Sequence, residues 1–132
     1  MLRVCDGINT YIVTPSGPGT FGTGGTVNAT GGAGAAGIGS GRSISSGYES
    51  SCLDVIITTG VTSVTATKGE GSPNSIGAGA GNASSCSLVA IGCSSFDGEG
   101  KPIDETVYWD GQSYQNGGDT YLTQSTLTYK PQ

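Results

Sequence analysis

The sequence predicts a mainly β protein, and three observations support this prediction. Short segments rich in β-branched and aromatic residues recur along the 132 residues. Glycine, serine and threonine, with 25, 17 and 16 residues, make up nearly half of the chain. No segment carries apolar residues at the 3.6-residue period of an amphipathic helix. Because the segments are short and turn residues separate them, we expect an antiparallel β-sandwich or a small barrel.

The chain divides by composition into two expected regions. Residues 1–47 are expected to hold one strand, at 9–14, followed by a glycine-rich segment, because twelve of the residues 16–47 are glycine. This segment is expected to be an extended arm or, alternatively, an ordered loop lying on something larger. Residues 48–132 are expected to form the antiparallel β domain. Ordering a backbone costs about 1–2 kcal/mol per residue, so we expect the arm to become ordered only within an assembly.

Turn signals separate the strands expected in the second region. Thr59-Gly60 predicts a hairpin between the first two of these strands. Asp110-Gly111 is typical of a two-residue hairpin turn with positive φ at both positions, and it predicts the pairs Trp109 with Gln112 and Val107 with Tyr114. The strands are expected at 53–58, 61–67, 87–91, 105–109, 112–115 and 120–129.

A weak internal repeat accompanies this pattern. Its first copy contains Ile38-Gly-Ser-Gly41, Ser50-Ser-Cys52 and Gly69-Glu-Gly71, and its second contains Ile76-Gly-Ala-Gly79, Ser84-Ser-Cys86 and Gly98-Glu-Gly100. If the duplication is real, Cys52 and Cys86 are equivalent positions on two similar β units. The alternative is chance similarity within a sequence rich in glycine and serine.

Four cysteines indicate disulfides, and we expect Cys5, Cys52, Cys86 and Cys93 all to be oxidised. Cys86 and Cys93 lie seven steps apart along one expected strand, roughly 23 Å, so they cannot pair within one chain. The other connectivities stay open, and so does the alternative of free buried thiols. Residues 1–11 lack the apolar stretch of an ordinary signal peptide. Disulfides would then mean either that an export segment has been removed by processing or that the protein leaves the cell by lysis.

Composition argues against most enzymatic and ligand-binding classes. The chain has no histidine, so Ser-His-Asp catalysis and Cys/His zinc sites are excluded. Five scattered basic residues do not form a nucleic-acid-binding patch, and no apolar run approaches the ~20 residues of a membrane span. The motif Gly32-x-Gly34-x-x-Gly37 is followed by no helix-forming segment, which argues against a dinucleotide site. We therefore expect a protein that is not an enzyme, with no catalytic residues, metal or cofactor.

Polar and aromatic clusters offer weaker candidates. An acidic group at Asp97, Glu99, Asp104 and Glu105 is expected to be a solvated loop rather than a calcium site. Asn28 and Asn82 begin glycosylation acceptor motifs in expected surface loops. Four aromatic residues near the C-terminus are candidates for a protein interface or a sugar-stacking surface, the alternative being that they form the core: Tyr108, Trp109, Tyr114 and Tyr121.

In general character the chain resembles small virion proteins of tailed phages, namely capsid decoration (cement) proteins and fibre or spike domains. The glycine-rich segment 16–47 and the hairpin series 106–129 carry this resemblance. It implies a non-enzymatic virion subunit that binds copies of itself and a major capsid or other virion protein, and that leaves the cell by lysis. A first alternative is an exported surface or pilus-type subunit at the cell surface. A second is a carbohydrate-binding β module.

Overall fold

The computed structural model describes residues 2–5, 10–13, 25–111, 114–115 and 121–131, the first two ranges by their backbone only. These residues form strands, turns and loops without a helix, which confirms the prediction of a mainly β protein. The described part therefore holds no helix long and apolar enough to cross a membrane. The strands are β1 (Leu2–Cys5), β2 (Thr10–Val13), β3 (Thr26–Thr30), β4 (Ile38–Gly39), β5 (Ser50–Thr58), β6 (Ser63–Thr67), β7 (Ile76–Gly77), β8 (Ser84–Cys93), β9 (Val107–Trp109), β10 (Tyr114–Gln115) and β11 (Thr126–Tyr129).

The strands form three sheets of mixed direction. Six strands pair in the order β10-β9-β8-β5-β1-β2, three in the order β11-β6-β3, and two as β4-β7. The pairs β5–β8, β3–β6 and β4–β7 are parallel, and the other pairs are antiparallel. The sheets are thus mixed, where the sequence led us to expect mostly antiparallel pairing. The reason is that consecutive strands from β3 to β8 lie in different sheets, while their parallel partners lie one repeat away.

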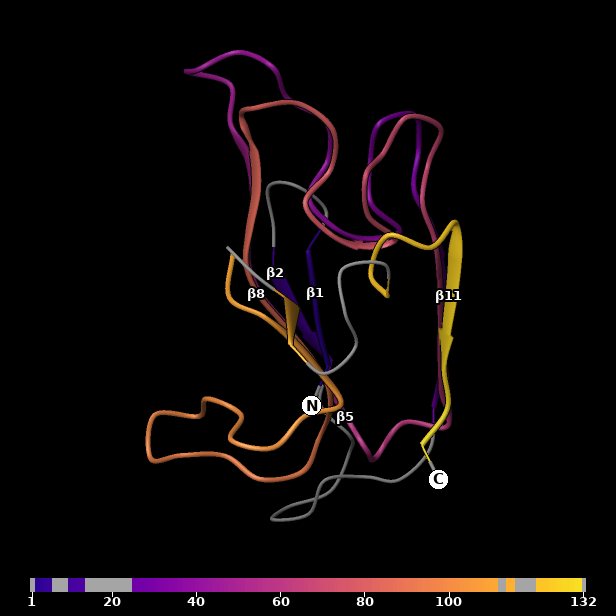
Figure 1. Cartoon of the computed structure of the whole chain (residues 1–132), viewed down its shortest axis with the longest axis vertical. Helices are drawn as coiled ribbons and strands as arrows, with labels where there is room; N and C mark the ends of the chain where they lie inside the picture. The colour runs from indigo at the N-terminus through magenta and orange to yellow at the C-terminus, as the bar shows by residue number, and fades with distance from the viewer. Residues whose placement is uncertain (1, 6–9, 14–24, 112–113, 116–120, 132) are drawn as a thin grey trace.

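The three parallel pairs define two stacked coils. The first coil, residues 25–58, runs through β3, β4 and β5, and the second coil, residues 63–93, runs through β6, β7 and β8 in the same order. Seen along the stacking direction, the traces of the two coils nearly superpose (Figure 1). The layer of β5 and β8 faces the layer of β6 and β11, and the short β4–β7 pair lies at one end between them (Figure 1). This arrangement is a two-coil β-solenoid.

The repeat seen in the sequence corresponds to this stacking. Ile38 pairs with Ile76, Ser50 with Ser84 and Cys52 with Cys86, which confirms two of the three repeated motifs as structural equivalents. The third motif pair is not equivalent, because the turn at Gly69 stacks on Gly32 of the first coil.

Glycine allows the backbones of the two coils to touch. An ideal Cβ on Gly69 would lie 1.7 Å from the Gly32 carbonyl oxygen, and one on Gly79 would lie 2.4 Å from the Gly41 oxygen. Backbone hydrogen bonds join the same segments: the Gly34 amide donates to the Glu70 carbonyl at 2.7 Å. Because stacking buries backbone directly against backbone, side chains are excluded at these positions.

The described part of the expected arm therefore belongs to the folded unit. Residues 25–47 supply β3, β4 and the fully buried Ile38 to the core within a single chain, so the expected boundary between 47 and 48 falls inside the first coil. Composition concealed this, since glycine at the stacking positions resembles glycine in a flexible segment. The remainder of the expected arm, 16–24, lies outside the described residues.

Each coil contributes a layer of branched side chains to one core. Neighbours across the coils are Ile38 with Ile76, Val55 with Val89, and Ile57 with Ile91, all of them completely buried. The remaining buried members of this core cluster are Cys52, Val64, Ala66, Cys86, Val107, Leu122, Leu127 and Tyr129. A smaller cluster of Ile56, Leu88, Ala90 and Cys93 lies on the outer face of the β5–β8 layer, with Phe96 and Tyr108 packed against it.

Two expected hairpins differ from the structure. Thr59-Gly60 is a turn, but it carries the chain from β5 in one sheet to β6 in another instead of pairing them. Asp110-Gly111 lies in the β9–β10 connection, where Gly111 has φ of 87° as expected. Trp109 pairs with Tyr114 rather than with Gln112, because the connection contains four residues instead of two.

The C-terminal segment closes the second coil. Both the amide and the Oγ of Ser75 donate to the Leu122 carbonyl at 2.8 Å, and the Leu122 side chain is fully buried. This inward turn explains why the last strand begins at Thr126 instead of the expected 120. On the side of the first coil that faces away from the second, β1 pairs with the edge of β5 opposite β8.

Candidate interaction surfaces

The cysteines occupy buried positions on neighbouring strands. Cys86 and Cys93 are free thiols, so the prediction that all four cysteines are oxidised is wrong for these two. They lie on opposite faces of β8, Cys86 in the main core and Cys93 in the outer cluster, which confirms that they cannot pair with each other. Cys52 is buried beside Cys86, and the side chain of Cys5 lies outside the described part of the structure.

Burial suppresses the reactivity of both free thiols. Desolvation raises the pKa of Cys86 to about 12 and the pKa of Cys93 to about 11. The Cys86 thiol also contacts the Leu88 carbonyl, with the sulfur 3.6 Å from the oxygen. Because the thiolate is the nucleophile, these two residues act as small core side chains at neutral pH.

Two of the four aromatic candidates form a cap over the second coil. The rings of Trp109 and Tyr114 stack with centroids 5.9 Å apart. The Tyr114 hydroxyl donates to Asn74 Oδ1 at 2.8 Å, and Asn74 Nδ2 donates to the Ala78 carbonyl at 2.9 Å. Trp109 also lies against Gly77, whose ideal Cβ would be 3.2 Å from the indole ring. The pair therefore packs on the second coil with one of its faces.

The other two aromatic candidates are also partly buried. Tyr108 packs against the outer cluster, whereas Tyr121 packs against the main core. Burial raises the pKa of Tyr121. The structure thus brings Trp109 and Tyr114 together and places Tyr108 against a different cluster.

The acidic loop uses its carboxylates to hold turns. Asp97 Oδ1 accepts from the amides of Glu99 and Lys101, both at 2.9 Å. Asp104 accepts from Ser94 and Ser95, including the Ser94 hydroxyl at 2.6 Å. These hydrogen bonds hold the pKa of both aspartates below the ordinary value. Within the described ranges no three carboxylates, cysteines or histidines gather as a metal site.

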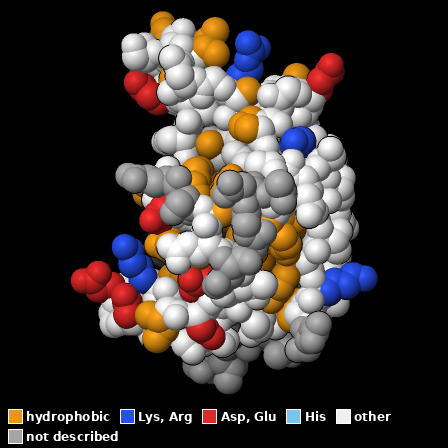
Figure 2. All heavy atoms as spheres, in the orientation of Figure 1, with side chains coloured by type: hydrophobic (Ala, Val, Ile, Leu, Met, Phe, Trp, Pro, Cys, Tyr) orange, Lys and Arg blue, Asp and Glu red, His pale blue; other side chains and the backbone are white. Residues whose placement is uncertain are grey.

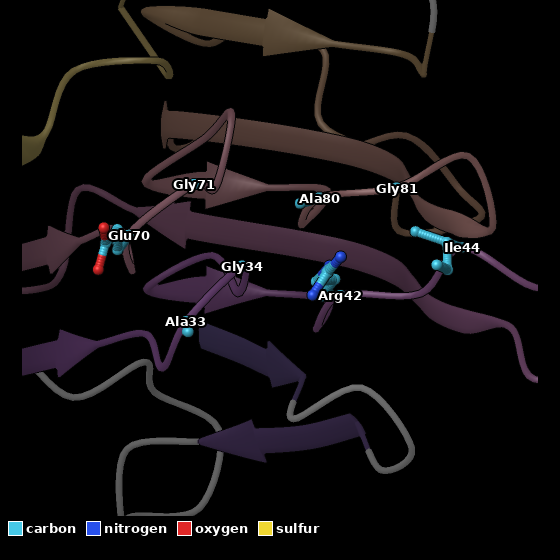
Figure 3. A pocket seen from close by; sticks show the side chains of 8 residues that line it. All are labelled: Ala33, Gly34, Arg42, Ile44, Glu70, Gly71, Ala80 and Gly81. Atoms are coloured by element: carbon cyan, nitrogen blue, oxygen red, sulfur yellow. The ribbon is translucent and has the colours of Figure 1, made fainter.

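A shallow open depression of about 330 Å³ lies over the glycine-rich turns of both coils. Arg42 lies beside Gly34 and below Ala80 in this view, with Glu70 towards one end and Ile44 towards the other (Figure 3). The aliphatic part of the Arg42 side chain packs on Gly34, where an ideal Cβ would lie 2.6 Å from Cδ. Within the GxGxxG motif, Gly32 therefore serves coil stacking and Gly34 serves arginine packing.

Exposed apolar side chains gather at the outer corner of the first coil. Ile44 and Tyr48, 62% and 81% exposed, belong to the loop between β4 and β5, and Leu53 on β5 is 65% exposed. The matching connection in the second coil is shorter. Figure 2 shows this corner with hydrophobic, basic and acidic side chains close together, and a separate line of hydrophobic side chains over the core between the two main layers.

The outer edge of β3 is a surface that the sequence-based reasoning missed. No described strand pairs with this edge, and its residues, Thr-Val-Asn-Ala-Thr, carry neither charge nor proline. A comparison of this segment with Ser63-Val-Thr-Ala-Thr67 would have revealed it, because both share Val-x-Ala-Thr and occupy equivalent positions.

No family model, curated protein or solved structure matches the chain.

Proposed function

We propose that this chain is a non-enzymatic structural subunit of an assembly, and specifically an accessory virion protein of the capsid decoration or fibre type. The observation that carries the proposal is the coil stacking through glycine, which joins residues 25–93 by backbone contacts around a single core. Such a unit supplies a stiff surface and few reactive side chains. Its partners in this proposal are other copies of itself and a major capsid or other virion protein.

The small number of coils supports a role in an assembly. One coil cannot bury its own apolar face, and solenoids gain stability as further coils stack. In the described part of the chain two coils stack, and antiparallel strands border them at β5 and β8. Contacts with neighbouring subunits would add the burial that further coils supply in longer solenoids.

An exported surface subunit is the second candidate. Asn28 and Asn82 are both exposed, as glycosylation acceptors must be. A carbohydrate-binding role has less support, since Trp109 and Tyr114 already use one face in packing on the second coil.

Quantitative mass spectrometry of purified source particles tests the proposal. We expect the chain in a fixed ratio to the major capsid protein, with an abundant host cytosolic protein as the control for contamination. Recovery in the cell-envelope fraction and absence from particles would replace the first proposal with the second. Absence from both fractions would overturn both.

We also propose a disulfide between Cys5 and Cys52. Leu2 pairs with Ile57 in antiparallel register, so Cys5 and Cys52 belong to adjacent paired strands, β1 and β5. Since Cys86 and Cys93 are free, Cys5 is the intrachain partner that remains for Cys52. Peptide mapping without reduction should recover the Cys5–Cys52 pair, and two unlinked peptides would contradict it.

A further inference from the structure

The second coil shows what stacking requires of a sequence. Gly69 and Gly79 have no φ in the left-handed region, so their backbone conformations accept any residue. What excludes a side chain is the first coil, whose Gly32 and Gly41 carbonyl oxygens lie where the Cβ atoms would be. Glycine is therefore required at these two positions because a neighbouring coil packs against them.

The first coil carries glycine at the equivalent positions, Gly32 and Gly41, although no neighbour among the described residues demands it. An ideal Cβ on Gly32 would meet nothing within 4 Å, and one on Gly41 would meet only Ser50 Oγ, at 3.3 Å. Both have backbone conformations open to other residues. Following the equivalence with Gly69 and Gly79, these absent side chains would point away from the second coil.

The outer edge of β3 borders the same side of the first coil. Sheet edges that stay unpaired are usually protected by charge, proline or a bulge, and β3 has no charged residue and no proline. Its outward side chains, Thr26, Asn28 and Thr30, are exposed, while Val27 and Ala29 are only partly buried. Another strand could extend the three-stranded sheet here without meeting a charge.

We propose that this side of the first coil, formed by β3, Gly32 and Gly41, binds a second copy of the chain. The proposal rests on the assembly role proposed above and names the self-contact within it. The equivalent side of the second coil is covered by backbone of this same chain, which shows that a surface of this kind accepts backbone packed directly against it.

The geometry points to a twofold dimer rather than a head-to-tail stack. The opposite side of the molecule is closed by Trp109 against Gly77 and by Leu122 against Ser75. At both of these places a later segment of the chain covers the backbone of the second coil. Two copies can instead meet through the same surface, with β3 antiparallel to its copy, and an isologous contact of this kind closes at two subunits.

Analytical ultracentrifugation over a range of concentrations tests the contact. Gly32→Ala adds a methyl group to open space in the single chain, so it should leave the melting temperature measured at dilution unchanged. In the dimer the same methyl group meets backbone, and we expect the dimer dissociation constant to rise at least about tenfold. Gly98→Ala is the matched control, since its Cβ also meets nothing within 4 Å and the residue lies in the acidic loop.

A charge on the β3 edge provides a second test. Asn28→Lys should weaken the dimer by bringing two ammonium groups together near the twofold axis, and salt should partly restore it. Asn82→Lys, at an exposed position in the second coil, should have no effect.

The outcomes separate the inference from the proposed function. A chain that stays monomeric at its highest soluble concentration, or a dimer insensitive to Gly32→Ala and Asn28→Lys, would overturn the inference while leaving particle incorporation untouched. A dimer sensitive to both substitutions, from a chain that is absent from particles, would support the contact and overturn the virion role.

Discussion

Gly69→Ala should break the contact between the two coils and cost about 3 kcal/mol of unfolding free energy. The added Cβ would lie 1.7 Å from the Gly32 oxygen and 2.5 Å from the Gly32 carbonyl carbon. Both atoms belong to the backbone, so no side chain can rotate away, and the coils must separate by more than an ångström. Overpacking usually costs 1–3 kcal/mol, and this site lies at the upper end of that range.

The neighbouring hydrogen bonds give a similar magnitude. Three backbone bonds join the coils around this position: Gly31 to Thr67 at 2.9 Å, Gly69 to Ala35 at 2.9 Å, and Gly34 to Glu70 at 2.7 Å. Each contributes about 1 kcal/mol net, so losing all three also costs about 3 kcal/mol. Both values describe the free energy lost when the coils separate, so the total cost stays at about 3 kcal/mol.

Urea unfolding followed by circular dichroism measures the effect. With a slope of about 2 kcal/mol/M, the midpoint of Gly69→Ala should fall by about 1.5 M. Gly98→Ala, which removes a glycine without creating a contact, should stay within about 0.5 kcal/mol of the unmodified chain. If Gly69→Ala also stays within that margin, the coils do not stack at the distance described.

Three further predictions follow from the cap, the hairpin and the thiols. Gly111→Val should lower the melting temperature, because φ of 87° costs a side chain roughly 1–2 kcal/mol, and an unchanged value would contradict the hairpin conformation. Tyr114→Phe removes the hydrogen bond to Asn74 and should cost about 1 kcal/mol in urea unfolding, whereas no loss would mean that the hydroxyl is solvated instead. Cys86 and Cys93 keep their protons more tightly when folded, with pKa values of about 12 and 11 against an ordinary 9.0. Their contribution to stability is therefore complete below pH 9 and is lost as the pH rises towards 11–12, so a pH series of urea midpoints should fall in that window, more steeply than in Cys86→Ala.

The sequence predicted strands where branched residues are dense. The strand at 87–91 lies within β8, and the strand at 53–58 lies within β5. The expected strand at 9–14 contains β2. These segments carry their own β-forming signal, and burial in the core reinforces it.

Pairing could not be predicted from local signals. A turn such as Thr59-Gly60 leads to a hairpin when the next strand returns along the same sheet, but here the chain turns a corner into another sheet. The competing partner of β5 is β8, more than thirty residues away, and only the weak repeat around Cys52 and Cys86 indicated it.

The glycine-rich segment carries few local signals for its own structure. Glycine lowers the intrinsic preference for any regular structure, so residues 25–47 resembled a flexible arm. Val27 and Ile38 nevertheless face the core, whereas Ile44 is exposed. The aromatic candidates show the opposite difficulty: Trp109 and Tyr114 are prominent in the sequence, yet packing occupies much of their surface.

Solution NMR tests the coil stacking on which the account rests. We expect cross-strand nuclear Overhauser effects for the parallel register of β5 on β8, around Val55 and Val89, and of β3 on β6, around Val27 and Val64. The coil stacking would be contradicted by nuclear Overhauser effects that pair β5 with β6 in antiparallel register across Thr59-Gly60, with none between β5 and β8.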